Sequence, residues 1–401
     1  MTELRLPETG RAAAEEFVSA RLAHLCSDDV RGSGSVRGGA TAAESALASF
    51  EVRGYARTRN EVLPPDSRGA SRLSPYIRHG LLSLQRVWNS VEGGPEKDVR
   101  RFRDELLWQE YSRHWYATHG SRTGRGVRRE MVVARDGEGW DRDLACVSTA
   151  IDELHTDGWL VNQQRMWLAS HWSVRNGFDW RRGEDEFFRH LLDGSRAANR
   201  LGWQWVTGVG SAKPYGFSRW QVDKRAPGLC STCPHNQACP IEDFPTEPAY
   251  AEQPEYQRMD SPGLFGPTEV QKQGPSEWLW LTAESLGNDP AMSANPELPA
   301  VFVFDAPLLS RLQLSSKRLV FLTETLADLG TRRKLVLRLG DPLEELAGLS
   351  LSVTHAPVPR FARLISKLKV SETHPWQWLC PPGGARVNSF STWRRSVEEP
   401  T

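Results

Sequence analysis

Residues 158–205 read GWLVNQQRMWLASHWSVRNGFDWRRGEDEFFRHLLDGSRAANRLGWQW. The first part of this stretch, residues 159–170, has no glycine or proline and predicts a helix. Positions i, i+3, i+6 and i+7 place four unlike side chains on or near one face of that helix: Trp159, Asn162, Arg165 and Met166. Periodicity alone fits a half-buried helix whose polar side chains reach water at their ends. An aromatic ring, an amide, a guanidinium and a thioether together are nevertheless not an ordinary core stripe.

The composition of the whole chain excludes several classes of protein. Its 401 residues are enough for about two or three domains with their own cores. Lys plus Arg and Asp plus Glu each number 50, so a DNA-binding surface would have to be a local basic patch. No apolar run approaches a membrane span, residues 1–17 lack the apolar part of a secretory signal, and six cysteines do not suggest a disulfide framework. We therefore expect a cytoplasmic protein without a membrane segment.

Four segments carry a resemblance to a known family. GWLxNxxRM at 158–166 and DWRxGExxFxxHLLDGxxAANxxGWQW at 179–205 resemble the FAD-binding domain of the photolyase and cryptochrome family. Residues 55–83, YARTRNEVLPPDSRGASRLSPYIRHGLLS, and residues 104–111, DELLWQEY, are similar to two further segments of that domain. The resemblance implies an all-helical FAD-binding domain, with reduced FAD as the cofactor.

The resemblance assigns one set of residues to the flavin. Residues 70–74 would cradle the FAD pyrophosphate, although alone they would be interpreted as a serine-rich helix cap. Arg165 and Asp193 would form an ion pair against the isoalloxazine, and Asn199 would face flavin N5. The full set of expected cofactor-binding residues is Tyr55, Ser71, Arg72, Leu73, Ser74, Trp159, Arg165, Asp193, Ser195 and Asn199.

A second set is assigned to a flipped pyrimidine dimer in DNA. Glu105 and Trp108 share a face of the helix predicted over 96–119, where the family's Glu bonds the damaged base and its Trp lies beside it. The expected catalytic residues are Glu105, Trp108, Asn162, Met166 and Trp205. Enzymes for the (6-4) photoproduct typically carry His where this chain has Asn162 and Met166, which favours the cyclobutane lesion. Gln109 stands where the family usually has Arg.

The tryptophans and a loop of arginines extend this assignment. Trp203 and Trp180 match the proximal and middle members of the family's electron-relay chain, and Trp140 or Trp115 could be the distal member. A loop after the 96–119 helix carries four cations that either contact DNA phosphates or are simply solvated: Arg122, Arg125, Arg128 and Arg129.

A cysteine cluster lies in LCSTCPHNQACPIEDFP at 229–245. Its three thiols need a fourth ligand, which His235 would supply for zinc and a distant cysteine for an iron–sulfur cluster. The family's bacterial iron–sulfur branch has a ligand shortly before the flavin-facing helix, where this chain has Cys146. We therefore expect a [4Fe–4S] cluster, with structural zinc as the alternative, held by Cys146, Cys230, Cys233 and Cys239.

The last third of the chain changes character. Residues 245–275 are rich in Pro, Gly, Glu and Gln and predict a linker. After it, predicted strands alternate with predicted helices, which indicates a small Rossmann-like parallel α/β domain. This segment resembles the family's antenna domain, which normally comes first, so the domain order would be inverted by circular permutation. An unrelated α/β domain is the alternative, and the antenna chromophore is left unknown.

Taken together, the expected fold is multidomain, α and α/β. Residues 1–244 would form the helical FAD-binding domain with the iron–sulfur site, 245–275 the linker and 276–401 the α/β domain. The expected function is light-driven repair of cyclobutane pyrimidine dimers, the activity of a deoxyribodipyrimidine photo-lyase, by a monomer that binds damaged DNA. The alternatives are a cryptochrome-like blue-light photoreceptor without repair activity, and a light-independent flavin and iron–sulfur protein.

Overall fold

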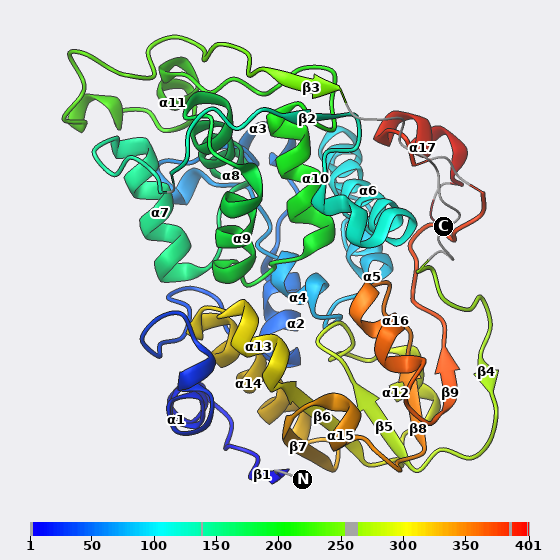
Figure 1. The fold of residues 1–401 in the computed structure, drawn as a ribbon. Helices are drawn as coiled ribbons and strands as arrows, with labels where there is room; N and C mark the ends of the chain where they lie inside the picture. The colour runs from blue at the N-terminus through cyan, green and yellow to red at the C-terminus, as the bar shows by residue number, and fades with distance from the viewer. Residues whose placement is uncertain (1–2, 138, 253–263, 385–386, 399, 401) are drawn as a thin grey trace.

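The computed structural model describes residues 3–137, 139–252, 264–384, 387–398 and 400. A helical part is followed by an α/β part, which lies below it in Figure 1. The helices of the first part are α2 (Ala40–Ser49), α3 (Tyr55–Thr58), α4 (Ser74–Arg78), α5 (Leu84–Asn89), α6 (Glu96–His119), α7 (Ala145–Asp157), α8 (Asn162–Ala169), α9 (Trp180–His190), α10 (Arg196–Thr207) and α11 (Arg219–Arg225). No helix among the described residues is long and apolar enough to cross a membrane.

Helix α8 begins later than its sequence suggests. Gly158 has a φ of 67°, the left-handed conformation that commonly ends a helix, and it ends α7. The next three residues belong to no helix or strand, and the Val161 N–H donates to the Gln164 side chain, so the helix starts only at Asn162. The prediction of a helix over 159–170 is therefore wrong at its start. Trp159 reaches the site from the preceding loop and not from the helix.

The sheet of the second part has the strand order β1 (Glu3–Leu4), β7 (Leu335–Gly340), β6 (Ala300–Asp305), β5 (Trp278–Leu281), β8 (Leu351–Thr354), β9 (Val370–His374) and β4 (Gln271–Lys272). The five inner strands are parallel, and the two edge strands are antiparallel to their neighbours. In order of sequence the inner strands run 3-2-1-4-5, the doubly wound order whose direction reverses between β5 and β8. The predicted parallel α/β sheet is confirmed.

Aspartate and proline set the turns that lead out of these strands. Asp289, Asp305 and Asp341 cap helices α12 (Pro290–Ala294), α13 (Ala306–Leu312) and α15 (Pro342–Glu345) by accepting a backbone N–H. Each of these helices has proline in its first turn, where the missing N–H costs nothing. The chain therefore turns sharply at the carboxyl ends of the strands, which face the helical part.

Short segments from outside residues 276–401 complete the sheet. Strand β1, at the start of the chain, pairs with β7, and β4, within the predicted linker, pairs with β9. The other end of that linker forms β3 (Tyr250–Glu252), which pairs with β2 (Arg129–Met131) in the helical part. Residues 253–263 of the linker lie outside the described residues. The two edge strands cover sheet edges that would otherwise offer unpaired backbone groups.

Helix α14 (Ser316–Gly330) joins the two parts. It is almost wholly buried, with α1 (Arg11–Arg21) packed along it. Its Lys317 pairs with Asp28 at 3.3 Å, and its Glu324 pairs with Arg37 at 2.6 Å. One continuous apolar cluster runs from α6 through α14 to strand β6. The helical and α/β parts therefore share a core.

The described residues 375–384 and 387–398, called the strap below, return to the helical part. The Glu110 carboxylate on α6 accepts the N–H groups of Leu379 and Cys380 at 2.6 and 3.0 Å. The Tyr111 hydroxyl donates to the Val387 carbonyl at 3.0 Å. The strap ends in α17 (Phe390–Ser396), which lies beside α6 in Figure 1 and buries Trp393 completely. The last helix of the α/β part is α16 (Pro359–Ile365), from which β9 leads into the strap.

Candidate functional site

A cavity of about 1220 Å³ lies between the helical part and the carboxyl ends of β5 and β6. Sites for small molecules usually measure about 300–1,000 Å³, so this cavity has room for a large cofactor and a further ligand. All the residues predicted to contact flavin or dimer line it, except Leu73, which is fully buried behind them. The structure thus brings together side chains from α6, α8, α10 and two loops that are far apart in sequence.

The ion pair predicted beside the flavin is formed. Arg165 Nη1 and Nη2 donate to the two carboxylate oxygens of Asp193 at 3.2 and 2.8 Å, a bidentate arrangement. Burial of Asp193 disfavours its charged form, but the Arg165 guanidinium, the Ser74 hydroxyl and Arg318 together outweigh burial and hold the pKa of this carboxyl below its ordinary value. The pair is therefore charged at neutral pH and rigidly oriented at the cavity wall.

At the same wall of the cavity, the side-chain amide of Asn199 has an N–H donor that is unpaired within the described ranges. Its side chain is 6% exposed, it lines the cavity from α10, and its Nδ2 has no hydrogen-bond partner among the described residues. A buried donor without an acceptor costs free energy, and an acceptor within the cavity would remove that cost. A flavin ring, which carries acceptor nitrogens and oxygens, fits this requirement, as does the volume of the cavity.

The predicted pyrophosphate loop reaches the cavity just before α4. Arg72 has a φ of 57°, an uncommon conformation for a residue other than glycine, and its guanidinium lies 4.8 Å above the Trp159 ring. Trp159 Nε1 in turn donates to Ser74 Oγ at 3.3 Å. Ser71 lines the cavity beside them, and Ser195 lines it from the N-terminus of α10. Tyr55 does so from α3, and burial raises the pKa of its hydroxyl.

The residues predicted to contact the dimer lie near the mouth of the cavity. The Trp108 and Trp205 side chains are 38% and 44% exposed, although both are large and apolar. Glu105 lies one turn before Trp108 on α6 and accepts a hydrogen bond from Arg59 Nε at 3.4 Å. Partial burial disfavours the charged carboxylate and raises the pKa of Glu105. The nearby Arg59 guanidinium only partly offsets that effect. Arg59 was not among the predicted site residues, and no feature of its local sequence identifies it as the partner of Glu105.

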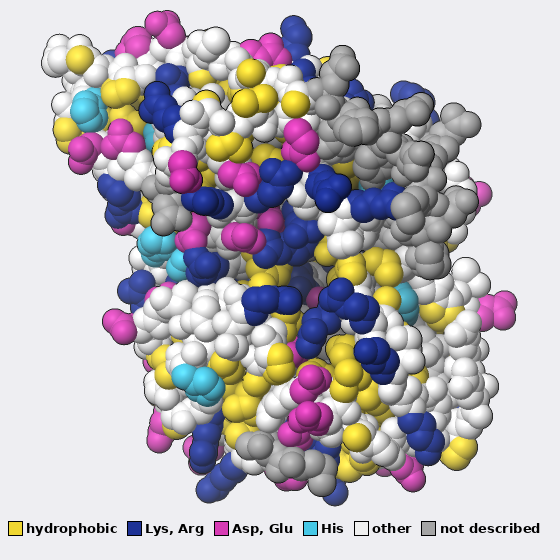
Figure 2. Space-filling view, viewed as in Figure 1, with side chains coloured by type: hydrophobic (Ala, Val, Ile, Leu, Met, Phe, Trp, Pro, Cys, Tyr) yellow, Lys and Arg dark blue, Asp and Glu magenta, His cyan; other side chains and the backbone are white. Residues whose placement is uncertain are grey.

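The cavity is strongly positive although the chain is neutral overall. Eleven arginines and only four carboxylates line it. Figure 2 shows Lys and Arg side chains gathered across the middle of the molecule, where the helical and α/β parts meet. The arginines are Arg59, Arg72, Arg78, Arg113, Arg165, Arg196, Arg200, Arg311, Arg318, Arg360 and Arg363. The local basic patch that DNA binding would require is therefore present at this cavity.

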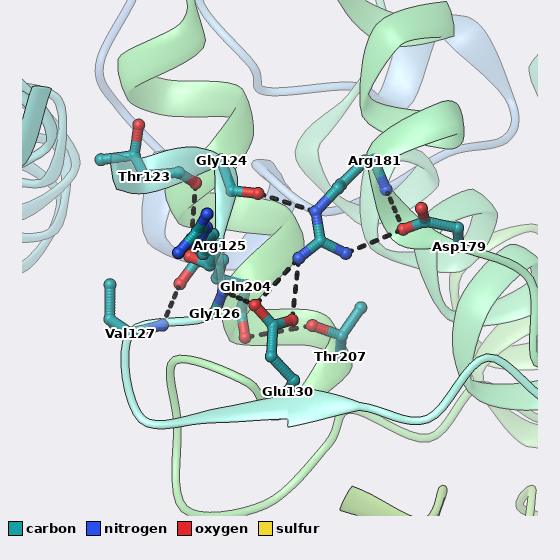
Figure 3. A network of polar contacts seen from close by, with 10 residues as sticks. All are labelled: Thr123, Gly124, Arg125, Gly126, Val127, Glu130, Asp179, Arg181, Gln204 and Thr207. Atoms are coloured by element: carbon teal, nitrogen blue, oxygen red, sulfur yellow. Dashed lines mark hydrogen bonds and ion pairs between the residues drawn. The ribbon is translucent and has the colours of Figure 1, made fainter. Parts of the chain in front are cut away.

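The loop of residues 122–129, called the arginine loop below, is held mainly by Gln204, as Figure 3 shows. Gln204 Nε2 donates to the carbonyls of Thr123 and Arg125 at 2.8 and 2.9 Å, and Gln204 Oε1 accepts the Val127 N–H at 3.1 Å. Arg181 adds a bond to the Gly124 carbonyl at 2.7 Å. Of the four arginines expected either to contact DNA phosphates or to be solvated, Arg129 instead donates to the Gly208 and Ala212 carbonyls.

Arg125 and Arg128 are exposed on that loop, and Arg122 is half-buried at its start. Gln204 itself was missed by sequence reasoning, although it stands between two tryptophans that were assigned. Its partners are backbone carbonyls and an N–H, and these groups give no signal in a sequence.

The rings of Trp203, Trp172 and Trp140 lie next to one another, while the relay through Trp203 and Trp180 stays a prediction. Trp203 lines the cavity, and Trp180 is buried outside the lining. A Cβ on Gly183 would collide with the ring of Trp203 and lie 3.1 Å from the ring of Trp172, so this glycine allows the two rings to approach each other. Trp172 then lies 4.6 Å from Trp140, centroid to centroid. Trp140 is half-buried, whereas Trp115, the other predicted distal member, is buried on α6 against His119.

The four cysteines predicted as ligands lie around one small, largely apolar cavity of about 10 Å³, together with His235. Burial, and then repulsion from Cys230 and the other two thiolates, raises the pKa of Cys146 to about 12. Four thiols have the chemistry that a cluster needs, but a volume of this size holds about one water molecule. Within the described ranges, no group of three or more His, Cys, Asp or Glu side chains could hold a metal ion.

Comparisons with known proteins agree on the helical part. Residues 102–225 match the family model described as the FAD binding domain of DNA photolyase. The deoxyribodipyrimidine photo-lyase of Thermus thermophilus is 34% identical over 183 residues, which are 40% of this chain and 40% of that protein. The photo-lyase of Escherichia coli is 31% identical over 38% of this chain and 35% of its own length.

Two further matches are a cryptochrome and a photolyase of known structure. Cryptochrome DASH of Idiomarina loihiensis is 27% identical over 52% of this chain and 49% of its own length. The crystal structure of a bacterial class III photolyase from Agrobacterium tumefaciens is 28% identical over 47% of this chain and 42% of its own, with a TM-score of 0.39. The chain thus spans half or less of the curated relatives named here. Residues 102–225 are a FAD-binding domain of the photolyase and cryptochrome family.

Proposed function

We propose that this protein repairs cyclobutane pyrimidine dimers in DNA with light, as a photo-lyase does. The observation that carries the proposal is that two sets of side chains face one cavity. The Arg165–Asp193 pair and the unpartnered Asn199 amide suit a flavin, while Glu105, Trp108 and Trp205 suit a base that has left the helix. One cavity would therefore hold the electron donor and the lesion side by side.

FAD would be held by the residues that line the inner part of the cavity. Arg72 and Ser71 would meet its phosphates, and Arg165, Asp193 and Asn199 would meet its ring. When bound and reduced, FAD supplies the light-driven electron transfer. The share of the protein is to bind and orient the two partners and to exclude water from between them.

The dimer would be held near the mouth by flat rings and hydrogen bonds. Trp108 and Trp205 offer exposed ring surface, which favours an unstacked base over a paired one. Burial raises the pKa of Glu105, and the protonated carboxyl could donate to a carbonyl of the dimer. Asn162 and Met166 line the same cavity and would contact the dimer, and Arg125 and Arg128 would meet DNA phosphates.

The α/β part is proposed to be the antenna domain, placed after the flavin domain by circular permutation. The cavity continues to Thr282 and Pro357, which follow β5 and β8 at the point where the strand order reverses. Open α/β sheets bind ligands at this point, so an antenna chromophore of unknown identity could lie there.

The four cysteines are proposed to hold a [4Fe–4S] cluster, with zinc as the alternative ion. The support is their convergence on one cavity, which the loop of residues 230–239 would have to widen. Iron, sulfide and zinc analysis of the purified protein, and of a Cys146→Ser variant, decides between the two. Four irons and four sulfides per chain are expected, and their absence together with one zinc would overturn the cluster.

A cryptochrome-like photoreceptor is the second candidate, because Gln109 stands at the cavity where the family usually has Arg. The deciding experiment mixes the reduced protein with an oligonucleotide that carries one thymine dimer, in blue light and in darkness. Light-dependent loss of the dimer is expected. The Glu105→Ala variant should cleave about tenfold less per absorbed photon, and the exposed control Glu16→Gln should match the wild type. A flavin that is photoreduced without any dimer loss would favour the photoreceptor instead.

A further inference from the structure

The strap at the end of the chain reaches the wall of the proposed substrate site. The Phe390 ring of α17 stacks on the Trp108 ring of α6, with centroids 3.8 Å apart and planes at 12°. Trp108 lines the cavity, whereas Phe390 is not among the described residues that line it. Phe390 therefore covers one face of the indole from outside, and the cavity meets the rest of the ring.

Several contacts with α6 fix the strap in place beside Trp108. Trp393, one turn after Phe390, is fully buried, with its ring 5.5 Å from Tyr111 and 5.2 Å from His114. Nearer the start of the strap, Cys380 makes two contacts with α6, because its N–H donates to Glu110 and its carbonyl contacts His114 Nε2 at 2.9 Å. Tyr111 also meets Phe390 edge-on at 5.7 Å, which limits how the stacked ring can turn.

The exposed Trp108 ring keeps one orientation only if a neighbouring group restricts its rotation. An indole that is 38% exposed has few side-chain neighbours to restrict its rotation about the bonds that join it to the helix. A parallel ring at 3.8 Å, on a helix that the buried Trp393 anchors, restricts that rotation and also prevents any base from stacking on the covered face.

We propose that Phe390 is a positioning residue for lesion recognition. It holds the Trp108 indole as a fixed wall, so that an unstacked base can lie against the cavity side of that ring only. The role is supplied by the last helix of the chain, about 280 residues after Trp108, and would make recognition depend on the strap. The part that concerns lesions rests on the proposed function; the part that concerns Trp108 does not.

The first experiment tests the hold on Trp108 without any DNA. Tryptophan is replaced by 5-fluorotryptophan throughout, and the ¹⁹F NMR signal of Trp108 is identified by its loss in Trp108→Phe. In Phe390→Leu, which keeps apolar volume but removes the stacked ring, this signal should shift and change its width. The control is Ser391→Ala, an exposed neighbour on the same helix, which should leave it in place. A Trp108 signal that is unchanged in Phe390→Leu would overturn the proposal.

The second experiment measures recognition in the dark by fluorescence anisotropy. Binding of an oligonucleotide with one thymine dimer is compared with binding of the undamaged one. Phe390→Leu should weaken lesion binding by about three- to tenfold and leave the affinity for undamaged DNA and the cleavage per bound lesion unchanged. Tighter lesion binding would show that the strap obstructs the site, and equal loss on both oligonucleotides would show a merely structural role. Either result would overturn the proposal.

The two experiments separate this proposal from the proposed function. A wild-type protein that does not distinguish the damaged oligonucleotide would defeat the repair function, and Phe390 would then have no lesion to position. The ¹⁹F measurement would still decide whether Phe390 fixes Trp108. A melting temperature of Phe390→Leu within the range of Ser391→Ala confirms that Trp393 still anchors the strap in both variants.

Discussion

At the scale of single residues, Gln204 makes a testable contribution to stability. Its amide satisfies two carbonyls and one N–H of the arginine loop, and it is only 1% exposed. Gln204→Leu leaves those buried backbone groups without partners, so we expect a loss of about 1–3 kcal/mol in the free energy of unfolding. Gln204→Glu keeps the acceptor for the Val127 N–H but places a carboxylate oxygen against the two carbonyl oxygens, which repel it. It should lower the free energy of unfolding at least as much.

Urea denaturation of the flavin-loaded protein measures this prediction. Gln273→Leu, which replaces an exposed glutamine, is the control and should change the free energy of unfolding very little. A Gln204→Leu protein as stable as that control would contradict the prediction, because it would mean that the loop finds other partners. Loosening of the loop should also weaken binding to undamaged DNA, since Arg125 and Arg128 would lose their fixed places.

Some roles of single residues could be predicted from the sequence and others could not. The resemblance singled out Arg165, Asp193 and Asn199, because these side chains act by their own chemistry within a dense motif. Arg59 and Arg318 have no such motif. Arg318 donates to the carbonyl of Gly194 from a helix of the other part, and bonds from side chains to a distant backbone depend on how the two parts pack.

At the scale of elements, the packing of α9 against α10 predicts an electron path. Gly183 lets the rings of Trp203 and Trp172 approach, and Trp172 leads on to the half-buried Trp140. We expect Trp172→Phe to slow photoreduction of the bound flavin by about tenfold or more, which corresponds to a barrier about 1.4 kcal/mol higher. Trp180→Phe, at the position predicted from the resemblance, is the comparison and should have a smaller effect.

The measurement is the rate of flavin reduction in blue light with an external thiol as the electron source. Equal flavin content and equal melting temperature in both variants are needed for the comparison, because Trp172 and Trp180 are both buried. If Trp180→Phe were the slower variant, the path would follow the family's pattern and the approach of Trp172 to Trp203 would be only packing.

Element boundaries show why the sequence was a partial guide. The alternation of strands and helices after residue 276 was recognised because β5, β6, β7 and β8 have four to six residues each, with apolar side chains in every one of them. Strand β9, whose sequence VSETH has a single apolar residue, was not predicted. Strands β1 and β4 have two residues each, too few for any periodic pattern, and so they were not predicted. Helix α8 was predicted to start too early, because the left-handed turn at Gly158 ends one helix without marking where the next begins.

At the scale of the whole molecule, the arrangement of the two parts is what sequence patterns could not supply. Amphipathic patterns show that an element has a buried face, but not which of several apolar faces covers it. Helix α14 is buried on nearly all sides, between α1, the helical part and the sheet, and the strap binds α6 across some 270 residues. The cavity exists because of this docking, since its lining comes from both parts.

That docking should depend on pH through His79. The imidazole is 5% exposed and lies between the carbonyls of Ala283 and Leu192, at 2.8 Å from Nδ1 and 3.3 Å from Nε2, so it links the α/β part to the helical part. Burial, and then repulsion from Arg78 and Arg318, lowers the pKa of His79 to about 3. The unfolded chain takes up a proton at this residue near pH 6.5, but the folded chain does not.

The unfolded state therefore binds more protons between about pH 6.5 and pH 3, and the free energy of unfolding falls as the pH is lowered through that range. At pH 5 the contribution of His79 should be a loss of about 2 kcal/mol relative to pH 7. In His79→Gln that part of the slope should disappear, whatever the variant costs at pH 7. His155 and His171, whose pKa values burial lowers to about 4, keep a residual slope in both proteins. Urea denaturation at pH 7, 6 and 5 measures the difference, with exposed His24→Gln as the control that keeps the wild-type slope. If His79→Gln loses as much stability between pH 7 and 5 as the wild type, His79 is charged in the folded protein and binds both carbonyls as an imidazolium.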